Sequence, residues 1–478
     1  GDHIVSSSFP EVHVKRRYIK GANIKDYIYQ TGFGNRFSSE AVPNVLPKGI
    51  NTPQRVKYDL YSEELNGSSF IASRRDIRHV WMYRIRPSTS HGHISTSEMN
   101  THVLSIFSGN ENVELSATQE SWDPFPIPSR HTSDGIDFVC GITTVGGQGD
   151  PTLREGLAIH IYSADSSMTN SAFCNNDGDL LIIPQTGRLD IQTELGWMTV
   201  HPGEIAVIQA GIRFSVLLPD GPSRGRFLEV IMTFPNLAQW APMAWHCLRI
   251  SNHHAQTVQT WRIIYKLAGQ LHLCNQNHTP FDVVAWQGNL VPYKYAIEKF
   301  VNLANVEKTQ SDPTVYGVLT TKSKFPGVSL TDFLIFTPKW IATSNTFRPP
   351  YYHRNMSTEI MGLIYGEYGG SSHKLEPGGL SYEASYMPHG ETYETWRYAA
   401  TRELAPERTC EGTAAFMFHI SAPVFLTKWA LEGEGAGRRH SRSSQDEPLD
   451  SFQPHFLDHL EEVNLELKAV GLPSLTSN

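Results

Sequence analysis

The middle of the chain is a succession of short apolar runs separated by glycine, proline and polar residues. Residues 179–216, DLLIIPQTGRLDIQTELGWMTVHPGEIAVIQAGIRFSV, contain at least four such runs, with a turn about every 8–10 residues. Evenly spaced short strands of this kind are typical of antiparallel sandwiches and barrels. The same pattern returns later in the chain, in DFLIFTPKWIA, EIMGLIYGEYGG and TAAFMFHIS. The alternation therefore predicts a mainly β protein.

Helical patterns are sparse until the C-terminal end of the chain. In residues 456–471, FLDHLEEVNLELKAVG, apolar residues recur near helical spacing, and Gly471 is a suitable stop. The preceding stretch, EGEGAGRRHSRSSQDEP at 432–448, is polar, charged and rich in Gly and Ser. Such a composition predicts a flexible linker or loop before the helix.

The two β-rich regions contain stretches that suggest related barrels. Residues 196–203 read as a strand, a turn and a strand that resemble the second sequence box of cupin barrels. Residues 353–366, with the pattern H-x-N-x3-E-x6-G, resemble the first box. The first region offers no His/Glu cluster at comparable spacing. The expected fold is therefore bicupin-like, with double-stranded β-helix (jelly-roll) barrels and few helices.

This interpretation divides the chain into five expected parts. They are an N-terminal arm (1–26), an N-terminal β-rich domain with a metal-free cupin-like half (27–280), a C-terminal cupin domain with a metal site (281–431), a flexible linker or loop (432–448), and a C-terminal helix and tail (449–478).

Composition and charge narrow the class of protein. The 478 residues carry a formal net charge of −8, which speaks against a general nucleic-acid-binding surface. No apolar run approaches the ~18 residues of a membrane span, and the N-terminal segment lacks the apolar region of a secretory signal. The five cysteines form no CxxC pair, so a disulfide framework is not expected. These features predict a cytoplasmic protein that binds neither nucleic acid nor a membrane.

His353 and Glu359 lie six positions apart in FRPPYYHRNMSTEIMGLIYG. On a straight strand they would be about 20 Å apart, and on a helix they would lie on well-separated faces. They meet at one metal only if the chain turns between them, and residues 354–358 suit a turn. His389, in the turn YMPHG, is the natural third ligand. Two imidazoles and a carboxylate form the facial triad of non-haem Fe(II) oxygenases. On spacing alone, a His–Glu pair is more often a surface or outer-shell feature than a metal site.

Longer runs point to a family. They include YIYQTGFGN, DLYSEELNGSSF, WMYRIRPSTSH, NNDGDLLIIPQTG, TFRPPYYHRN, EIMGLIYG, MPHG and FLTKW. Over roughly residues 27–430 the chain resembles the homogentisate 1,2-dioxygenase family. The resemblance implies a bicupin-like fold and a homo-oligomer, either a trimer or a hexamer. It also implies that the protein uses Fe(II) and O2 to open the aromatic ring of a small phenolic substrate.

The resemblance assigns roles to individual residues. His353, Glu359 and His389 match the three iron ligands of the family. Tyr368 matches a substrate-binding tyrosine, and His389 is expected to lie against the substrate as well.

Two positions depart from the family pattern at the expected active site. Gln287, in AWQGN, stands where the family has a histidine that handles the phenolic proton, and Glu383 stands where it has another histidine. Glutamine cannot exchange a proton near neutral pH, so Glu383 is expected to act as a relocated base or as an ion-pair partner. A third departure is a shortened segment around residues 235–262.

These departures predict a diverged paralogue that oxidises a phenol or hydroquinone other than homogentisate. One alternative is the iron-dependent oxidation or rearrangement of another aromatic substrate in specialised metabolism. The other alternative is a non-catalytic cupin binding protein.

Overall fold

A computed structural model describes most of the chain. The described residues are 27–32, 36–48, 54–128, 135–231, 245–248, 259–300, 317–341, 344–345, 352–368, 375–390, 393–432, 439–440 and 455–476. The expected arm (1–26), most of the expected linker (432–448) and most of the shortened segment (235–262) lie outside them. The five expected domain boundaries stay predictions.

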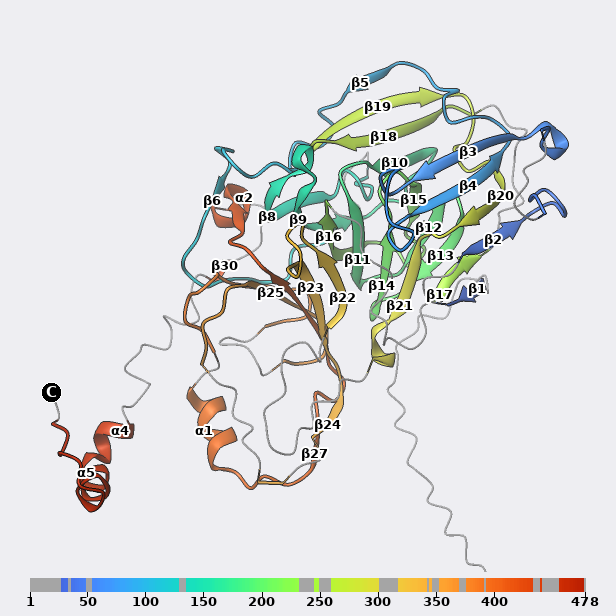
Figure 1. The fold of residues 1–478 in the computed structure, drawn as a ribbon. Coiled ribbons are helices and arrows are strands. Elements are labelled where there is room, and N and C mark those ends of the chain that lie inside the picture. The colour runs from blue at the N-terminus through green and yellow to red at the C-terminus, as the bar shows by residue number, and fades with distance from the viewer. Residues whose placement is uncertain are drawn as a thin grey trace, which may run out of the picture.

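The N-terminal half is built on a ten-stranded sheet (Figure 1). Its strands, in spatial order, are β1 (Ile28–Thr31), β17 (Trp245–Leu248), β21 (Tyr293–Ala296), β14 (Glu204–Ile208), β11 (Asp179–Thr186), β16 (Ser223–Val230), β9 (Glu155–Ala164), β8 (Ile142–Asp150), β29 (Phe425–Thr427) and β6 (Val113–Glu114). The predicted strands of residues 179–216 are β11, β14 and β15 (Arg213–Leu217), with the hairpin of β12 (Leu189–Thr193) and β13 (Gly196–Val200).

A seven-stranded sheet and a four-stranded sheet complete this half. The first contains β13 (Gly196–Val200), β12 (Leu189–Thr193), β15 (Arg213–Leu217), β10 (Ser171–Asn175), β18 (Trp261–Leu267), β19 (Gln270–Gln276) and β5 (Ile94–Thr96). The second contains β2 (Phe37–Glu40), β20 (Val283–Gly288), β4 (His79–Arg84) and β3 (Tyr61–Asn66).

The C-terminal half is built on another seven-stranded sheet. Its strands are β22 (Gly317–Lys322), β23 (Ser329–Phe336), β28 (Ala414–Ile420), β25 (Thr358–Tyr365), β26 (Leu380–Glu383), β7 (Glu120–Trp122) and β30 (Arg439–His440). A two-stranded ribbon of β24 (Lys339–Ile341) and β27 (Glu407–Thr409) extends from it. Because β7 comes from the N-terminal part of the chain and β29 returns to the ten-stranded sheet, the two halves are joined by exchanged strands.

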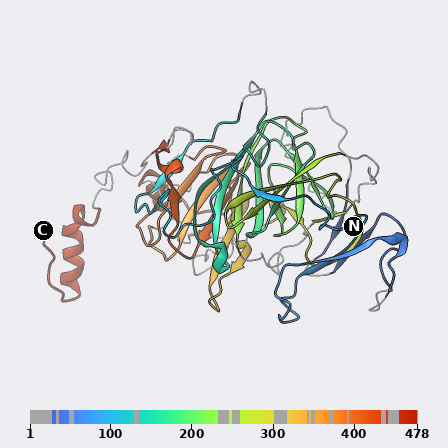
Figure 2. The same ribbon diagram turned by 90° about the horizontal axis from the view of Figure 1, so that it is seen from above.

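Helices are short and lie at the periphery. They are α1 (Tyr393–Thr401), α2 (Lys428–Glu432), α4 (His455–Asp458) and α5 (Leu460–Ala469), with 3-10 turns at η1 (Lys57–Asp59), η2 (Pro151–Leu153) and η3 (Ile297–Lys299). The predicted C-terminal helix is present as α4 and α5, and Gly471 follows it with a φ of +78°. Figures 1 and 2 draw this helix away from the rest of the protein. Among the described residues, no helix is long and apolar enough to cross a membrane.

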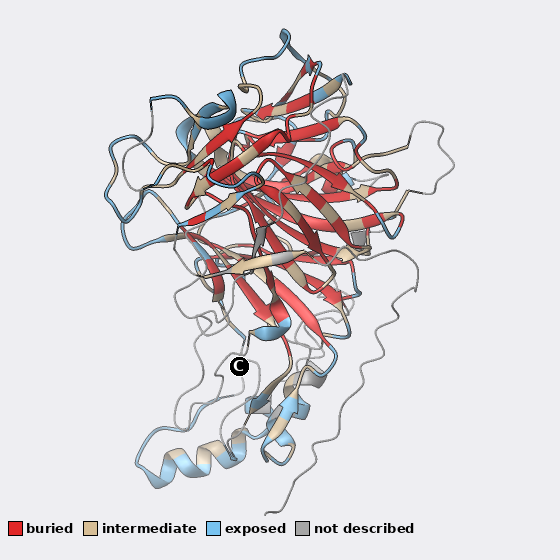
Figure 3. Ribbon diagram, turned by 90° about the vertical axis from the view of Figure 1, so that its right-hand side faces the viewer, coloured by how far each residue is buried: buried red, intermediate tan, exposed pale blue. Residues whose placement is uncertain are grey.

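The core has two layers because the ten-stranded sheet is covered on both faces. Along β16, Phe227 faces a cluster shared with the seven-stranded sheet of the N-terminal half, whereas Leu228 faces a cluster shared with the C-terminal half. A strand covered on both faces is apolar at successive positions, as the runs LLII on β11 and IAVI on β14 are. Figure 3 shows the buried residues concentrated along these central strands. The mainly β, bicupin-like fold is confirmed.

Candidate metal centre

The metal centre is built on one antiparallel ladder in the C-terminal half. Glu359, near the start of β25, lies directly opposite Glu383 on β26 and His419 on β28. His353 lies six residues before Glu359, and His389 lies six residues after Glu383. The two histidines pair in the same register as the two glutamates, through backbone hydrogen bonds of 3.0 and 3.1 Å. The backbone therefore fixes both histidines at the end of the strand pair that carries the carboxylate.

A turn between the two ends of the motif brings the ligands together. The Ser357 N–H donates to Asn355 Oδ1 at 2.8 Å, which closes a local turn. The Tyr386 N–H donates to the carbonyl of Asn355 at 2.7 Å, which ties this turn to the segment that precedes His389. The chain therefore turns between His353 and Glu359, as it must if two residues six positions apart are to bind one metal.

The three side chains converge on one point. His353 Nε2 lies 3.6 Å from Glu359 Oε1, and His389 Nε2 lies 3.4 Å from Glu359 Oε2. All three ligand atoms lie within 4.8 Å of one another, and no other such group of His, Cys, Asp and Glu is found among the described residues. The Glu359 side chain is 9% exposed and that of His353 31% exposed, so the cluster is held by the sheet yet reachable from one side.

The donor set fits a ferrous ion. His389 Nε2 is buried and has no hydrogen-bond partner, while Nδ1 lies 3.0 Å from the carbonyl of Met387. An imidazole that donates through Nδ1 to a carbonyl offers its Nε2 lone pair to a metal. Two imidazoles and one carboxylate on one side of an ion suit non-haem iron and leave coordination positions open. An unsatisfied Nε2 aimed at a carboxylate is therefore explained by a metal between them.

The protonation state of Glu359 also suits a ligand. Burial by itself would raise the pKa of Glu359, but the His353 and His389 side chains outweigh it and hold the pKa below its usual range. Asn355 Nδ2 adds a 2.7 Å hydrogen bond to Oε1. The carboxylate is ionised, and one of its oxygens is already oriented by an amide.

Comparison with known proteins gives this geometry a family. A family model described as homogentisate 1,2-dioxygenase N-terminal matches residues 28–297, and one described as homogentisate 1,2-dioxygenase C-terminal matches residues 298–445. The chain belongs to the homogentisate 1,2-dioxygenase family. The resemblance expected from the sequence runs is confirmed, and it extends over both halves.

Named relatives are similar over most of their length. The homogentisate 1,2-dioxygenase of Drosophila melanogaster is 43% identical over 427 residues, which is 86% of this chain and 94% of the relative. That of Arabidopsis thaliana is 41% identical, covering 86% and 91%, and that of Homo sapiens is 40% identical, covering 84% and 92%.

The two departures from the homogentisate 1,2-dioxygenase pattern lie in different places. Glu383 is buried beside the triad, because residues directly opposite on antiparallel strands project to the same face. Gln287 lies on β20 in the four-stranded sheet, where it hydrogen-bonds to Tyr83. Figure 1 shows β20 and β25 well apart. Within one chain, the structure brings Glu383 but not Gln287 to the triad.

Tyr368 belongs to the apolar wall of the same barrel face. Met361 and Leu363 follow Glu359 at every second position of β25, so their side chains project to the same face. Tyr368 packs into the cluster of Met361 and Leu363, and its ring lies 5.6 Å from that of Phe336. The tyrosine thus lies on the face where the resemblance places the substrate.

His419 was missed by sequence reasoning. Its Nε2 lies 3.9 Å from Glu359 Oε1 and its Nδ1 lies 3.9 Å from Asp332 Oδ2. The four side chains Asp332, His419, Glu359 and Glu383 form a row across adjacent strands. In the run AAFMFHIS the histidine is a single polar residue in an apolar strand, so only the strand pairing reveals its neighbours.

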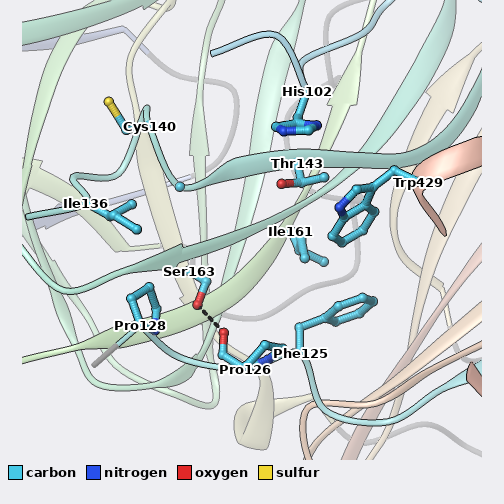
Figure 4. Close-up of a pocket in the computed structure, with 11 residues that line it drawn as sticks. His102, Phe125, Pro126, Pro128, Ile136, Cys140, Thr143, Ile161, Ser163 and Trp429 are labelled. Atoms are coloured by element: carbon cyan, nitrogen blue, oxygen red, sulfur yellow. Dashed lines mark hydrogen bonds between the residues drawn. The ribbon is translucent and has the colours of Figure 1, made fainter. Parts of the chain in front are cut away.

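A separate hollow lies away from the triad, against β8, β9 and α2. Its volume is about 270 Å³ (Figure 4). The rings of Phe125 and Trp429 stack at its side with centroids 5.8 Å apart, and the Ser163 hydroxyl donates to the carbonyl of Pro126. No triad residue lines it.

Proposed function

We propose that this protein is a non-haem Fe(II) dioxygenase of the homogentisate 1,2-dioxygenase type, which opens the aromatic ring of a phenol or hydroquinone with O2. The observation that carries the proposal is the convergence of His353, Glu359 and His389 on one point. Iron bound there would supply a template for the substrate and O2 and a path for electrons between them.

The protein's own residues position the reactants. Asn355 holds the Glu359 carboxylate in one orientation, and the carbonyl of Met387 selects the tautomer of His389. Met361, Leu363 and Tyr368 give the face an apolar lining, which suits the flat surface of an aromatic ring.

The substrate we propose is not homogentisate but a hydroquinone without an acidic side chain. Gln287 cannot take up the phenolic proton, and loss of a general base costs about 10²–10⁴ in rate. Glu383 adds a second carboxylate next to Glu359 on the same face, and like charges in a partly buried site repel an anionic substrate. A neutral or basic side chain on the ring relieves that repulsion.

We also propose a homo-oligomer, a trimer or a hexamer. Because β20 and β25 lie apart within one chain, Gln287 contributes to the reaction only if the four-stranded sheet of another copy lies against this triad. Mixing a chain carrying Glu359→Ala with one carrying Gln287→Ala tests this arrangement, since the mixture should then be more active than the two variants measured separately and added.

O2 uptake by the Fe(II)-loaded protein with a panel of hydroquinones tests the activity, with products analysed by mass spectrometry under ¹⁸O₂. The expected result is a ring-opened product from a non-acidic hydroquinone, with homogentisate slower by about 10²–10⁴. Turnover of homogentisate at the rate of the Drosophila relative would refute the substrate proposal. Bound iron without O2 uptake on any substrate would refute the enzyme and favour a non-catalytic cupin.

Glu383→Gln tests whether Glu383 is the relocated base. If it is, turnover falls by about 10²–10⁴ while the iron content stays unchanged. Asp332→Asn is the matched control, because Asp332 belongs to the same row but is two strands away from Glu359. Turnover retained in Glu383→Gln would restrict Glu383 to an electrostatic role.

A further inference from the structure

Arg226 is a buried arginine that reaches from the N-terminal half of the molecule into the C-terminal half. It lies on β16, and only 2% of the residue is exposed. Its Nη2 donates to the carbonyl of Gly379 at 2.9 Å and also to the carbonyl of Gly378. These two glycines come directly before β26, the strand that carries Glu383 and leads to His389. A charged side chain of one half therefore holds the start of a strand that belongs to the other half.

Neighbouring side chains of the N-terminal half hold the same part of the β25–β26 hairpin. Gln185, on β11, donates through Nε2 to the carbonyl of Ile364 near the end of β25, at 3.2 Å. Its Oε1 accepts hydrogen bonds of 3.0 and 2.7 Å from the Arg224 guanidinium, which orients the amide. Gly378 has a φ of +97°, and a Cβ atom on it would lie 2.7 Å from Arg224 Nη2, so this close approach requires glycine. Both strands are thus held at the end of the hairpin that is remote from Glu359.

The charge of Arg226 makes this contact costly. In the part of the chain that the structure describes, no carboxylate forms an ion pair with Arg226, and its Nε has no hydrogen-bond partner. Burial and the adjacent Arg224 guanidinium lower the pKa of Arg226 to about 9, so the side chain is still a cation at neutral pH. A buried charge without a partner of opposite charge lowers stability. Stability alone therefore does not explain a guanidinium at this position, whereas its directed hydrogen bonds to two carbonyls do.

The segment that these contacts hold also carries Tyr368. Tyr368 follows β25 and forms a β-bridge with Leu375, three residues before Gly378. The Gly378 N–H donates to the carbonyl of Leu363 at 2.9 Å, so the turn is tied to β25 as well as to Arg226. A shift of residues 375–379 would displace Leu375 and, through the bridge, Tyr368. The iron ligands lie at the other end of the hairpin, where the backbone bridge between the two histidines holds them.

We infer that Arg226 is a positioning residue, which fixes Tyr368 toward the substrate from the other half of the molecule and leaves the iron ligands in place. The inference rests on the proposed function, because the family resemblance assigns Tyr368 to the substrate. It makes substrate binding depend on the N-terminal half, whereas iron binding depends on the C-terminal half.

Arg226→Met and Arg213→Met form a matched pair of variants. Both remove a buried arginine of the N-terminal half, but the partners of Arg213 are Glu194 and Tyr265, which belong to that half themselves. In the Fe(II)-loaded protein, Arg226→Met should raise the KM for methylhydroquinone about tenfold, because a displacement of about 1 Å in a site can cost ~10²-fold. Arg213→Met should leave this KM unchanged and lower the Tm more, because it takes a cation away from a buried carboxylate. Arg226→Lys keeps a charged donor and should recover part of the lost affinity.

Hydrogen exchange, followed by mass spectrometry on the iron-loaded proteins under nitrogen, gives a readout that needs no turnover. The amides of residues 375–380 should exchange faster in Arg226→Met than in the native protein, while those of residues 353–359 keep the native rate. Arg213→Met should match the native protein in both segments. The iron content of all variants should equal that of the native protein.

Native exchange rates at residues 375–380 in Arg226→Met would overturn the inference. So would a KM that rises equally in Arg226→Met and Arg213→Met, since the effect would then follow stability, or a loss of iron from Arg226→Met. If the native protein opens no ring, the proposed function fails, and the Kd of the Co(II)-loaded proteins for methylhydroquinone replaces KM under the same criteria. If Arg226→Met does not fold, Gln185→Met, which removes the donor to Ile364, decides by the same measurements.

Discussion

The two halves of the molecule hold similar side chains with opposite outcomes. In the C-terminal half, Glu359 faces the Nε2 atom of His389, which has no hydrogen-bond partner. In the N-terminal half, Glu229 faces His160, but the Lys266 ammonium lies against both of its oxygens. In the C-terminal half an imidazole nitrogen is left for a metal, whereas in the N-terminal half an ammonium group of the protein already balances the charge of the carboxylate.

Removing a triad ligand should produce the largest effect. His389→Ala should lower the affinity for Fe(II) by more than the roughly 10–100-fold cost of losing an outer partner, and turnover should disappear with the metal. Elemental analysis after dialysis and O2 uptake measure both. His160→Ala is the matched control in the N-terminal half, and loss of iron from that variant would break the comparison.

Lys266→Met should be the most destabilising of the single changes in the buried cluster that Lys266 forms with Glu229 and Asp177. It leaves Glu229 and Asp177 buried without their cation, which costs about 3–5 kcal/mol of unfolding free energy. Urea denaturation measures the loss, and the iron content should not change. Lys294→Met is a control, because the Lys294–Glu204 pair is more exposed and should lose less. Equal losses of unfolding free energy in the two variants would show that burial of the ion pair does not determine the cost of removing its lysine.

Asn355 offers a test of how precisely the C-terminal site is oriented. Asn355→Leu removes the hydrogen bond to Glu359, and the affinity for Co(II) should fall about 10–100-fold in competition with a chelator. Asn355→Asp keeps the acceptor for the Ser357 N–H but not the donor to Glu359. If the Asn355→Asp protein binds Co(II) as tightly as the native protein, Asn355 supports the site by closing the turn and not by its hydrogen bond to the Glu359 carboxylate.

The smallest expected effect is a pH dependence. The folded pKa of Glu229 is lowered from 4.5, so its contribution to stability is complete above about pH 4.5 and is lost as the pH falls. The loss amounts to ~1.4 kcal/mol per unit of pKa shift. Unfolding free energies measured from pH 6 to pH 3 should fall less steeply in Glu229→Gln than in the native protein. If the unfolding free energies of the two proteins fall equally with pH, the protonation of Glu229 does not contribute to the loss of stability in acid.

The sequence predicts the strands and the approach of His353 to Glu359 for a common physical reason, whereas His389 is assigned through the family resemblance. Alternation and turn residues act over a few positions, and the turn at 354–357 brings His353 to Glu359 within one short segment. The N-terminal cluster escapes such reasoning, because His160, Glu229 and Lys266 come from three strands scattered along the chain. Their approach depends on two sheets packing face to face.

Other elements were missed because their surroundings decide them. The α1 segment Tyr393–Thr401 is helical, but at nine residues it is too short for its apolar spacing to stand out in the sequence. The place of Gln287 near the iron stays a prediction, because its motif does not state whether β20 reaches the triad of its own chain or that of another copy. The strands that pair with a segment, and not its local sequence, decide where its side chains lie in the fold.

The shared register of the His353–His389 and Glu359–Glu383 pairs has a consequence for how this protein tolerates change in length. Residues added between Tyr368 and Leu375 lengthen only the connection between the two arms, so the ligands keep their places. One residue added between His353 and Glu359 falls in the turn that positions the histidine and breaks the shared register of the two pairs. Natural insertions should therefore accumulate at the far end of this hairpin and be absent from its ligand-bearing end.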